Sequence, residues 1–127
     1  MTPEQREAFV VRPLPATLGT VDARGRAHVV PVIYLYEGDE FLVITARGSQ
    51  KVKNAIAAGR ATLCIEEREK MRYLSAEGPV RVVDPVSYET RLRLHTHYRG
   101  AEAALKSTSD GGHERMVALM ITPERWY

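Results

Sequence analysis

Several features that often define a protein's chemistry or location are scarce in this 127-residue chain. A single cysteine, Cys64, excludes an internal disulfide, and its apolar neighbours indicate a small buried residue rather than a reactive thiol. No run of about 18 apolar residues occurs, so no membrane-spanning helix is expected. The net charge is only +2, which does not favour nucleic acid as a partner. The charged N-terminal segment has no apolar signal core, and we therefore expect a cytoplasmic protein.

Motifs for self-contained catalysis or metal binding are also missing. The chain has no Gly-x-Ser-x-Gly elbow, no Cys-His pairing and no Gly-x-Gly-x-x-Gly fingerprint. His95 and His97 are two residues apart in a segment with a helical pattern, where such side chains do not face each other. His28 and His113 lie far away in sequence, so no metal site is expected. An enzyme of this kind would take its reactivity from a cofactor, and we assign no catalytic side chain.

The pattern of apolar residues and turns predicts one domain, residues 1–127, of mainly β (α+β) class. Residues 16–45 contain three strands separated by turns at 22–25 and 37–39, which predicts an antiparallel meander. Three further strands and three short helices complete the pattern. The predicted strands are 61–67, 71–84 and 115–122, and the predicted helices are 2–11, 49–59 and 85–100, with 107–112 as a loop. Six antiparallel strands with helices at the corners favour a small β-barrel.

The stretch "TARGSQKVKN", Thr45 to Asn54, contains an unusual density of hydrogen-bond donors where a strand gives way to a helix. A helix N-terminus offers free amides and the positive end of its dipole to an anion. Ser49 and Gln50 add neutral donors, and Lys51 adds a charge, as a phosphate site requires. The alternative is that Ser49 only caps the helix and that the lysines form a solvated face.

A proline interrupts the segment "HVVPVIYLY", residues 28–36, which otherwise has the pattern of a strand. Proline cannot donate to a ladder, so Pro31 is expected at a sheet edge, at a bulge, or where a ligand replaces the neighbouring strand. Alternation places the following residues on one face of the segment: His28, Val30, Val32, Tyr34 and Tyr36.

Four blocks occur in an order that resembles a known family. They are "ATLGTVDARGRAHVVPV", "FLVITARGSQKVKNAIAAGRATLCI", "YLSAEGPVRVV" and "RMVALMITPERWY". This order is similar to that of the split β-barrel flavin and deazaflavin oxidoreductases, the pyridoxamine 5′-phosphate oxidase-like proteins. The resemblance extends from about Pro13 to Tyr127. It implies a six-stranded antiparallel split β-barrel and a homodimer with the cofactor in a groove between the subunits.

The resemblance also implies cofactor-binding positions. A strand segment that meets the flavin ring corresponds to His28, Val29, Val30, Pro31, Val32 and Ile33. A second group corresponds to Ile44 and Thr45, and the phosphate corner to Arg47, Gly48, Ser49, Gln50 and Lys51. Tyr73 matches a further position that touches the flavin.

Departures from the family pattern narrow the expected activity. His28 and Gln50 stand where the oxidases carry arginine, and their C-terminal substrate-binding extension has no counterpart here. Oxidation of pyridoxamine phosphate is therefore not expected. "GSQK" with a short C-terminus is more similar to the subgroup that uses coenzyme F420, a deazaflavin, and includes biliverdin reductases. That likeness implies hydride transfer between reduced deazaflavin and an unsaturated or conjugated small molecule. The alternatives are an FMN-dependent oxidase or reductase and a non-catalytic flavin- or haem-binding protein.

Overall fold

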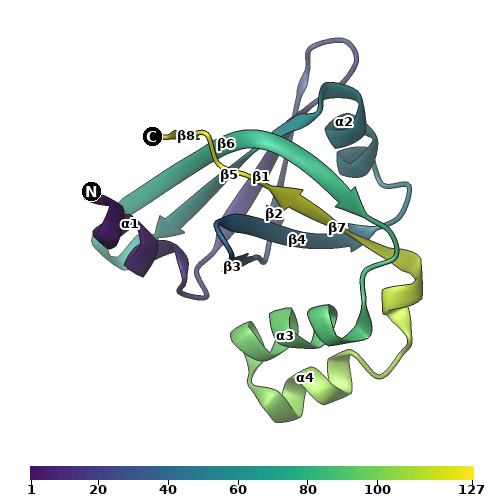
Figure 1. Cartoon of the computed structure of the whole chain (residues 1–127). Helices are drawn as coiled ribbons and strands as arrows, with labels where there is room; N and C mark the ends of the chain where they lie inside the picture. The colour runs from purple at the N-terminus through teal and green to yellow at the C-terminus, as the bar shows by residue number, and fades with distance from the viewer.

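The computed structural model describes residues 1–127 and consists of one curled antiparallel sheet with short helices around it (Figure 1). The strands are β1 (Ala16–Val21), β2 (Ala27–Val32), β3 (Leu35–Glu37), β4 (Glu40–Ala46), β5 (Arg60–Glu67), β6 (Arg72–Val83), β7 (Met116–Ile121) and β8 (Arg125–Trp126). The helices are α1 (Pro3–Val10), α2 (Gln50–Ala58), α3 (Tyr88–Arg99) and α4 (Ala101–Ser107). This confirms the predicted α+β class. None of the helices has the length and apolar character needed to cross a membrane.

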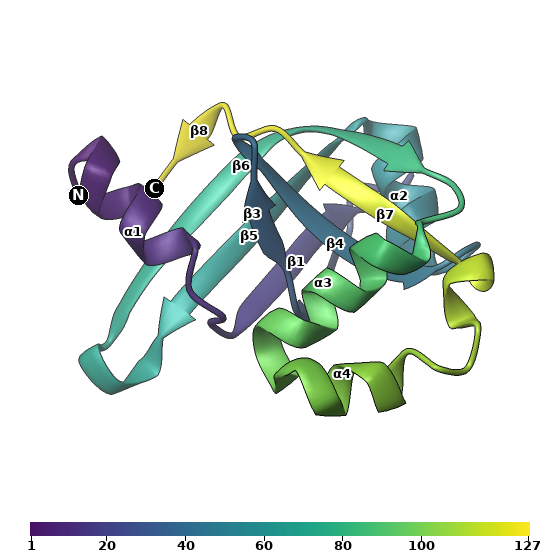
Figure 2. The same cartoon turned by 60° about the horizontal axis from the view of Figure 1, so that its bottom comes forward.

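The strand order is β2-β1-β5-β6-β7-β4-β3, with β8 added to β6, so β2 and β3 form the two edges. Only Ile33 and Tyr34 separate these edge strands in the sequence. Because successive Cα atoms are about 3.8 Å apart, Val32 and Leu35 are at most about 11 Å from each other. The two edges of the sheet must therefore approach one another, which rolls the sheet into a barrel that is split between β2 and β3 (Figures 1 and 2).

The predicted meander is wrong in one respect. β1 and β2 form a hairpin, as do β3 and β4, but the third predicted strand, β4, pairs with β3 and β7 instead of β2. The segment at 28–36, interpreted as one strand, is divided at Ile33 and Tyr34 where the chain passes from one edge to the other. Together with β8, this division raises the number of strands from the predicted six to eight.

Local signals account for the starts and ends of two helices. Thr2 and Gln5 form the predicted capping box ahead of α1, with proline at its first position. In α2, Val52 and Ala55 face the core, and Gly59 ends the helix in the left-handed conformation. Helix α4 is absent from the prediction, because "AEAALKS" has no capping residue and follows a glycine directly.

The hydrophobic core has two parts. The larger part, 18 buried residues, fills the inside of the curled sheet and includes side chains from α1, α2 and every strand from β4 to β7. The smaller part lies between the outer face of the sheet and α3, and consists of Leu35, Leu42, Val86, Leu94 and Ala118. Helices α3 and α4 form a hairpin below this face (Figure 2). One face of β4 and β7 thus contacts the barrel interior while the other contacts α3.

Candidate functional site

The corner between β4 and α2 keeps two backbone amides free of partners. Ser49 is the N-cap residue, yet its side chain makes no capping bond, and its Oγ lies 3.5 Å from Thr45 Oγ1. The amides of Gln50 and Lys51 lack partners within the helix because they belong to its first turn, and no other group of the chain accepts from them. The capping alternative for the Ser49 hydroxyl is therefore not what the structure shows. The corner presents two free amides and the Ser49 hydroxyl at a helix N-terminus, where an anion can bind.

Two side-chain hydrogen bonds connect this corner to β1, the strand that pairs with β2. Gln50 Nε2 donates to Asn54 Oδ1 over 2.7 Å, and Asn54 Nδ2 donates to Thr20 Oγ1 over 3.1 Å. Thr20 pairs directly with His28 across β1 and β2. Asn54 and Thr20 are both buried, so the bond between them is shielded from water. Two segments predicted separately, at residues 28–33 and 49–51, are thus brought together at one end of the barrel.

Sequence reasoning missed both linking residues, Thr20 and Asn54. The spacing of Gln50 and Asn54, four residues apart on a helix, is a signal that could have indicated their contact. Thr20 gives no comparable signal, because its partner lies 34 residues away. His28, which lies opposite Thr20 at the start of β2, has a buried Nδ1 with no hydrogen-bond partner. A buried ring nitrogen without a partner carries a free-energy cost, which a ligand with a suitable polar atom would remove.

The cations of the corner differ in their partners. Lys51 is half-buried in the first turn of α2 and forms no ion pair, whereas Lys53 is exposed. The guanidinium of Arg47 is already paired with Asp84, at 2.6 Å from Nη2 to Oδ1, and also donates to the carbonyl of Glu114. This ion pair lowers the pKa of Asp84. Arg47 therefore ties the corner to the segment before α3, and Lys51 is the cation left for an anion.

Strand β2 shows the edge position expected for Pro31. It pairs only with β1, where Pro31 lies opposite Thr17. Val30 and Val32 pack against the main core, as alternation predicts, while Val29 is 61% exposed on the other face. The outer edge of β2 leaves backbone groups without a neighbouring strand, at the place where the resemblance puts the flavin ring.

The remaining predicted residues divide between the corner and other parts of the fold. Thr45 is buried beside Ser49. Ile44 points to the opposite face of β4 and packs against the smaller part of the core, which includes Leu94 of α3. Tyr73 is 65% exposed and lies opposite Glu66 on β5. Glu66 is six residues along β5 from its start near α2, a separation of about 20 Å at about 3.3 Å per residue. Within one chain, Tyr73 does not join the corner.

A small set of groups could hold a phosphate-bearing cofactor here. The free amides and Ser49 hydroxyl suit phosphate oxygens, and Lys51 supplies a compensating charge. No three side chains among histidine, cysteine, aspartate and glutamate come together in a group that could bind a metal ion. The arrangement is suited to binding and orienting an anionic cofactor rather than to acid–base chemistry by side chains.

Solved structures with the same fold include proteins of different descriptions. An F420 reductase superimposes with a TM-score of 0.79 at 21% identity, covering 95% of this chain and 94% of the other. A conserved hypothetical protein from Mycobacterium tuberculosis gives 0.81 at 23% identity, with 99% and 82% coverage. HutZ, the haem storage protein from Vibrio cholerae, gives 0.73 at 15% identity, with 98% and 92% coverage. These likenesses establish the fold.

Comparison of sequences identifies the family. No curated protein sequence matches this chain significantly. The family model described as pyridoxamine 5′-phosphate oxidase matches residues 2–127, which is nearly the whole chain. The match agrees with the resemblance of the four sequence blocks and with the split barrel. The chain is a member of the pyridoxamine 5′-phosphate oxidase family.

Proposed function

We propose that this protein is an F420-dependent oxidoreductase that transfers a hydride between the reduced deazaflavin and an unsaturated or conjugated small molecule. The observation that carries the proposal is the pair of hydrogen bonds from Gln50 through Asn54 to Thr20, which lies opposite His28 in the pairing of β1 and β2. These contacts bring together the corner with free helix amides and the edge strand, the two places that the family resemblance assigns to cofactor phosphate and ring.

In this proposal the residues of the chain bind and orient the cofactor. When bound, a deazaflavin supplies the site that accepts or donates a hydride. The amides of Gln50 and Lys51, the Ser49 hydroxyl and the Lys51 ammonium hold the phosphate. His28 Nδ1, which has no partner in the chain, faces a polar atom of the ligand. The exposed edge of β2 aligns the ring, and the barrel wall excludes water from one side.

The preference for a deazaflavin over FMN depends on departures from the oxidase pattern. His28 and Gln50 replace two arginines, so the corner carries less positive charge than in the FMN oxidases. The likeness of fold to an F420 reductase supports this choice. FMN is the runner-up for the same site. A second alternative is a protein that binds haem without catalysing a reaction. The likeness of fold to HutZ is the reason to test it.

The cofactor test compares three ligands with the purified protein. We expect saturable quenching of deazaflavin fluorescence, with weaker binding of FMN and no haem-type absorbance. Reduced deazaflavin should then be oxidised in the presence of a conjugated acceptor. A yellow protein that retains FMN and does not bind the deazaflavin would refute the cofactor choice. Tight deazaflavin binding without turnover against a panel of acceptors would refute the enzyme assignment.

We also propose that the protein is a homodimer with the cofactor groove between subunits. Val29 is 61% exposed and Val21 is 47% exposed on the adjoining strands β2 and β1, in line with a partner surface. A second subunit would also bring its own Tyr73 to the groove, which this chain's Tyr73 does not reach.

Light scattering should give twice the mass of the 14.3 kDa chain at micromolar concentration. Val29→Lys should produce a folded monomer with weakened cofactor binding, because a lysine at a dimer interface must be desolvated. Leu105→Lys, at a residue 56% exposed on α4, is the matched control and should leave the dimer intact. A monomeric parent protein that binds the cofactor would refute the shared groove.

A further inference from the structure

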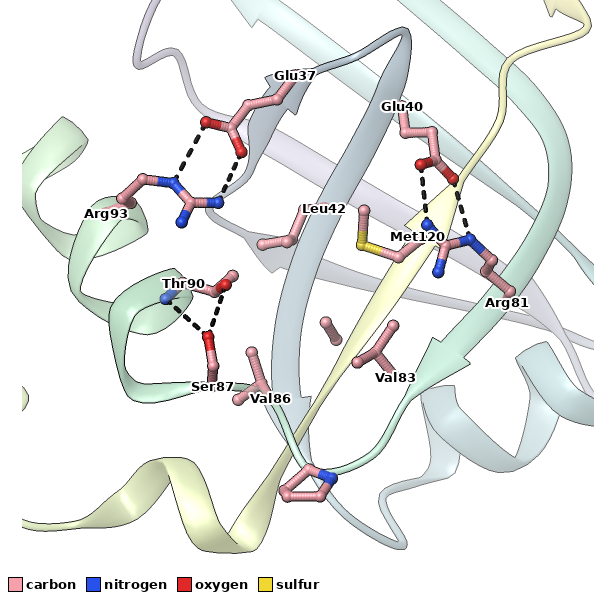
Figure 3. A pocket seen from close by; sticks show the side chains of 12 residues that line it. Glu37, Glu40, Leu42, Arg81, Val83, Val86, Ser87, Thr90, Arg93 and Met120 are labelled. Carbon is pink, nitrogen blue, oxygen red and sulfur yellow. Dashed lines mark hydrogen bonds and ion pairs between the residues drawn. The ribbon is translucent and has the colours of Figure 1, made fainter.

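The outer face of the sheet contains a hollow of about 290 Å³ that the proposed cofactor site does not use. It lies between α3 and strands β4, β6 and β7 (Figure 3). Its apolar lining is formed by Leu42, Val83, Pro85, Val86, Ala118 and Met120. Leu42, Val86 and Ala118 are fixed in the smaller part of the core, and Val83 is 37% exposed. The floor is therefore pre-formed, and its apolar surface is open to a ligand.

Two ion pairs form opposite walls of this hollow. Glu37 on β3 pairs with Arg93 on α3 at 2.8 Å, and Glu40 on β4 pairs with Arg81 on β6 at 3.0 Å. In each pair the carboxylate accepts from Nε and Nη2, which leaves the Nη1 group of the arginine free (Figure 3). The walls thus carry no net charge, yet they retain unused N–H donors.

The two hydroxyl groups at the rim bond to each other. Ser87 accepts a hydrogen bond from the amide of Thr90 and donates to the hydroxyl of Thr90, an arrangement that caps α3. These hydroxyls have a structural role, so the two guanidinium groups are the principal donors left for a ligand.

The hollow is separate from the cofactor corner. Successive residues of β4 point to opposite faces of the sheet, so Leu42 faces the hollow while Thr45 faces the barrel interior beside Ser49. The ion pair between Arg47 and Asp84 stands between the corner and Pro85 at the edge of the hollow. A ligand bound here would contact none of Ser49, Gln50 and Lys51.

We propose that this hollow is a second small-molecule site, for a neutral aromatic ligand with a carbonyl oxygen. A flat ring would cover the apolar floor, contact the Met120 sulfur and lie beside the planar guanidinium groups. The carbonyl would accept from a free Nη1 of Arg81 or Arg93. An anion gains little here because each arginine is neutralised by a glutamate, and those carboxylates would repel it. The volume is at the lower end of the usual range of roughly 300–1,000 Å³, which suits two or three fused rings.

Prodan, a neutral naphthyl ketone whose emission depends on its surroundings, is a direct probe. Titration into the full-length protein should give one saturable site with blue-shifted emission. Binding should persist in saturating FMN and in Lys51→Ala, since the cofactor corner is separate. Prodan binding thus tests the second site, and FMN or deazaflavin binding tests the proposed function, so the failure of one can be distinguished from the failure of the other. Absence of saturable binding, or displacement of prodan by FMN, would overturn the proposal.

Two variants test the position and the charge of the site. Val83→Phe fills the hollow and should weaken prodan binding by about tenfold or more, the effect of about 1.4 kcal/mol. Val11→Phe, the same change at a residue that is 44% exposed after α1, should alter it by less than about twofold. Equal losses in the two variants would contradict the location.

Glu40→Gln does not depend on filling the hollow and leaves Arg81 without its neutralising partner. Anilinonaphthalene sulfonate, an anionic probe, should bind the parent protein weakly and gain about threefold or more in this variant, since removing a nearby like charge favours an anion. Prodan should change little. An anionic probe that binds the parent protein as tightly as prodan, or that gains nothing in the variant, would refute the neutral-ligand assignment.

Discussion

Replacing Lys51 by alanine tests the phosphate corner most directly. Lys51 lies in the first turn of α2, beside its own free amide and that of Gln50, and no carboxylate of the chain pairs with it. Lys53 is two residues further along the same helix, is exposed and also has no ion pair. Residues two apart on a helix do not share a face, so Lys53→Ala is a matched control for the loss of one positive charge.

The expected loss follows from the kind of bond removed. A hydrogen bond assisted by charge contributes roughly 1.5–3 kcal/mol. Because each 1.4 kcal/mol is a factor of ten, Lys51→Ala should weaken cofactor binding by about one to two decades. Lys53→Ala should cost well below one decade. The free energy of unfolding should change by no more than about 0.5 kcal/mol in either variant, because neither lysine has a partner in the chain.

The assay is a fluorescence titration of the deazaflavin and of FMN into the parent protein and both variants, with thermal unfolding as a check on folding. Salt dependence adds a second measurement, since screening should reduce the difference between parent and Lys51→Ala. Equal and small losses for the two lysines would mean that the corner is a solvated helix start and that the phosphate lies elsewhere.

Two further predictions concern stability. Gly78→Ala should destabilise the protein by about 1–3 kcal/mol or more, seen as a lower urea midpoint, because its new Cβ would lie 1.8 Å from the backbone oxygen of Thr122. Gly19→Ala, whose nearest contact would be 3.8 Å, should cost far less, and equal losses would contradict the steric argument. The buried Arg91 lowers the pKa of Asp110 to about 2, from 3.8, so the stability that this pair contributes is complete above about pH 4 and is lost as the pH falls toward 2. Asp110→Asn should lower stability at neutral pH and flatten acid unfolding in this range, and an unchanged acid profile would show that the pair does not contribute.

Much of the corner was predictable from sequence, because its features are local. The change from a β-branched run to helical spacing at Ser49 marks the helix start within a few residues, and the structure begins α2 at Gln50. The partners of the corner were not predictable. Arg47, predicted as a cofactor contact, pairs with Asp84, 37 residues away, and Asn54 contacts Thr20, 34 residues away. Such contacts depend on which strands become neighbours, and alternation alone does not specify this.

By itself, the sequence determined the class of the fold, most of the strands, the capping box at Thr2 and the family, since each depends on hydrogen bonds or periodicities that extend over a few residues. The tertiary structure decided that the chain breaks at Ile33 and Tyr34 and that β2 and β3 become the two edges of one curled sheet. It also decided that His28 and Gln50 share one end of the barrel. The physical reason is that burying the apolar faces of eight strands in a common core fixes the strand order, and this order brings distant polar side chains into contact.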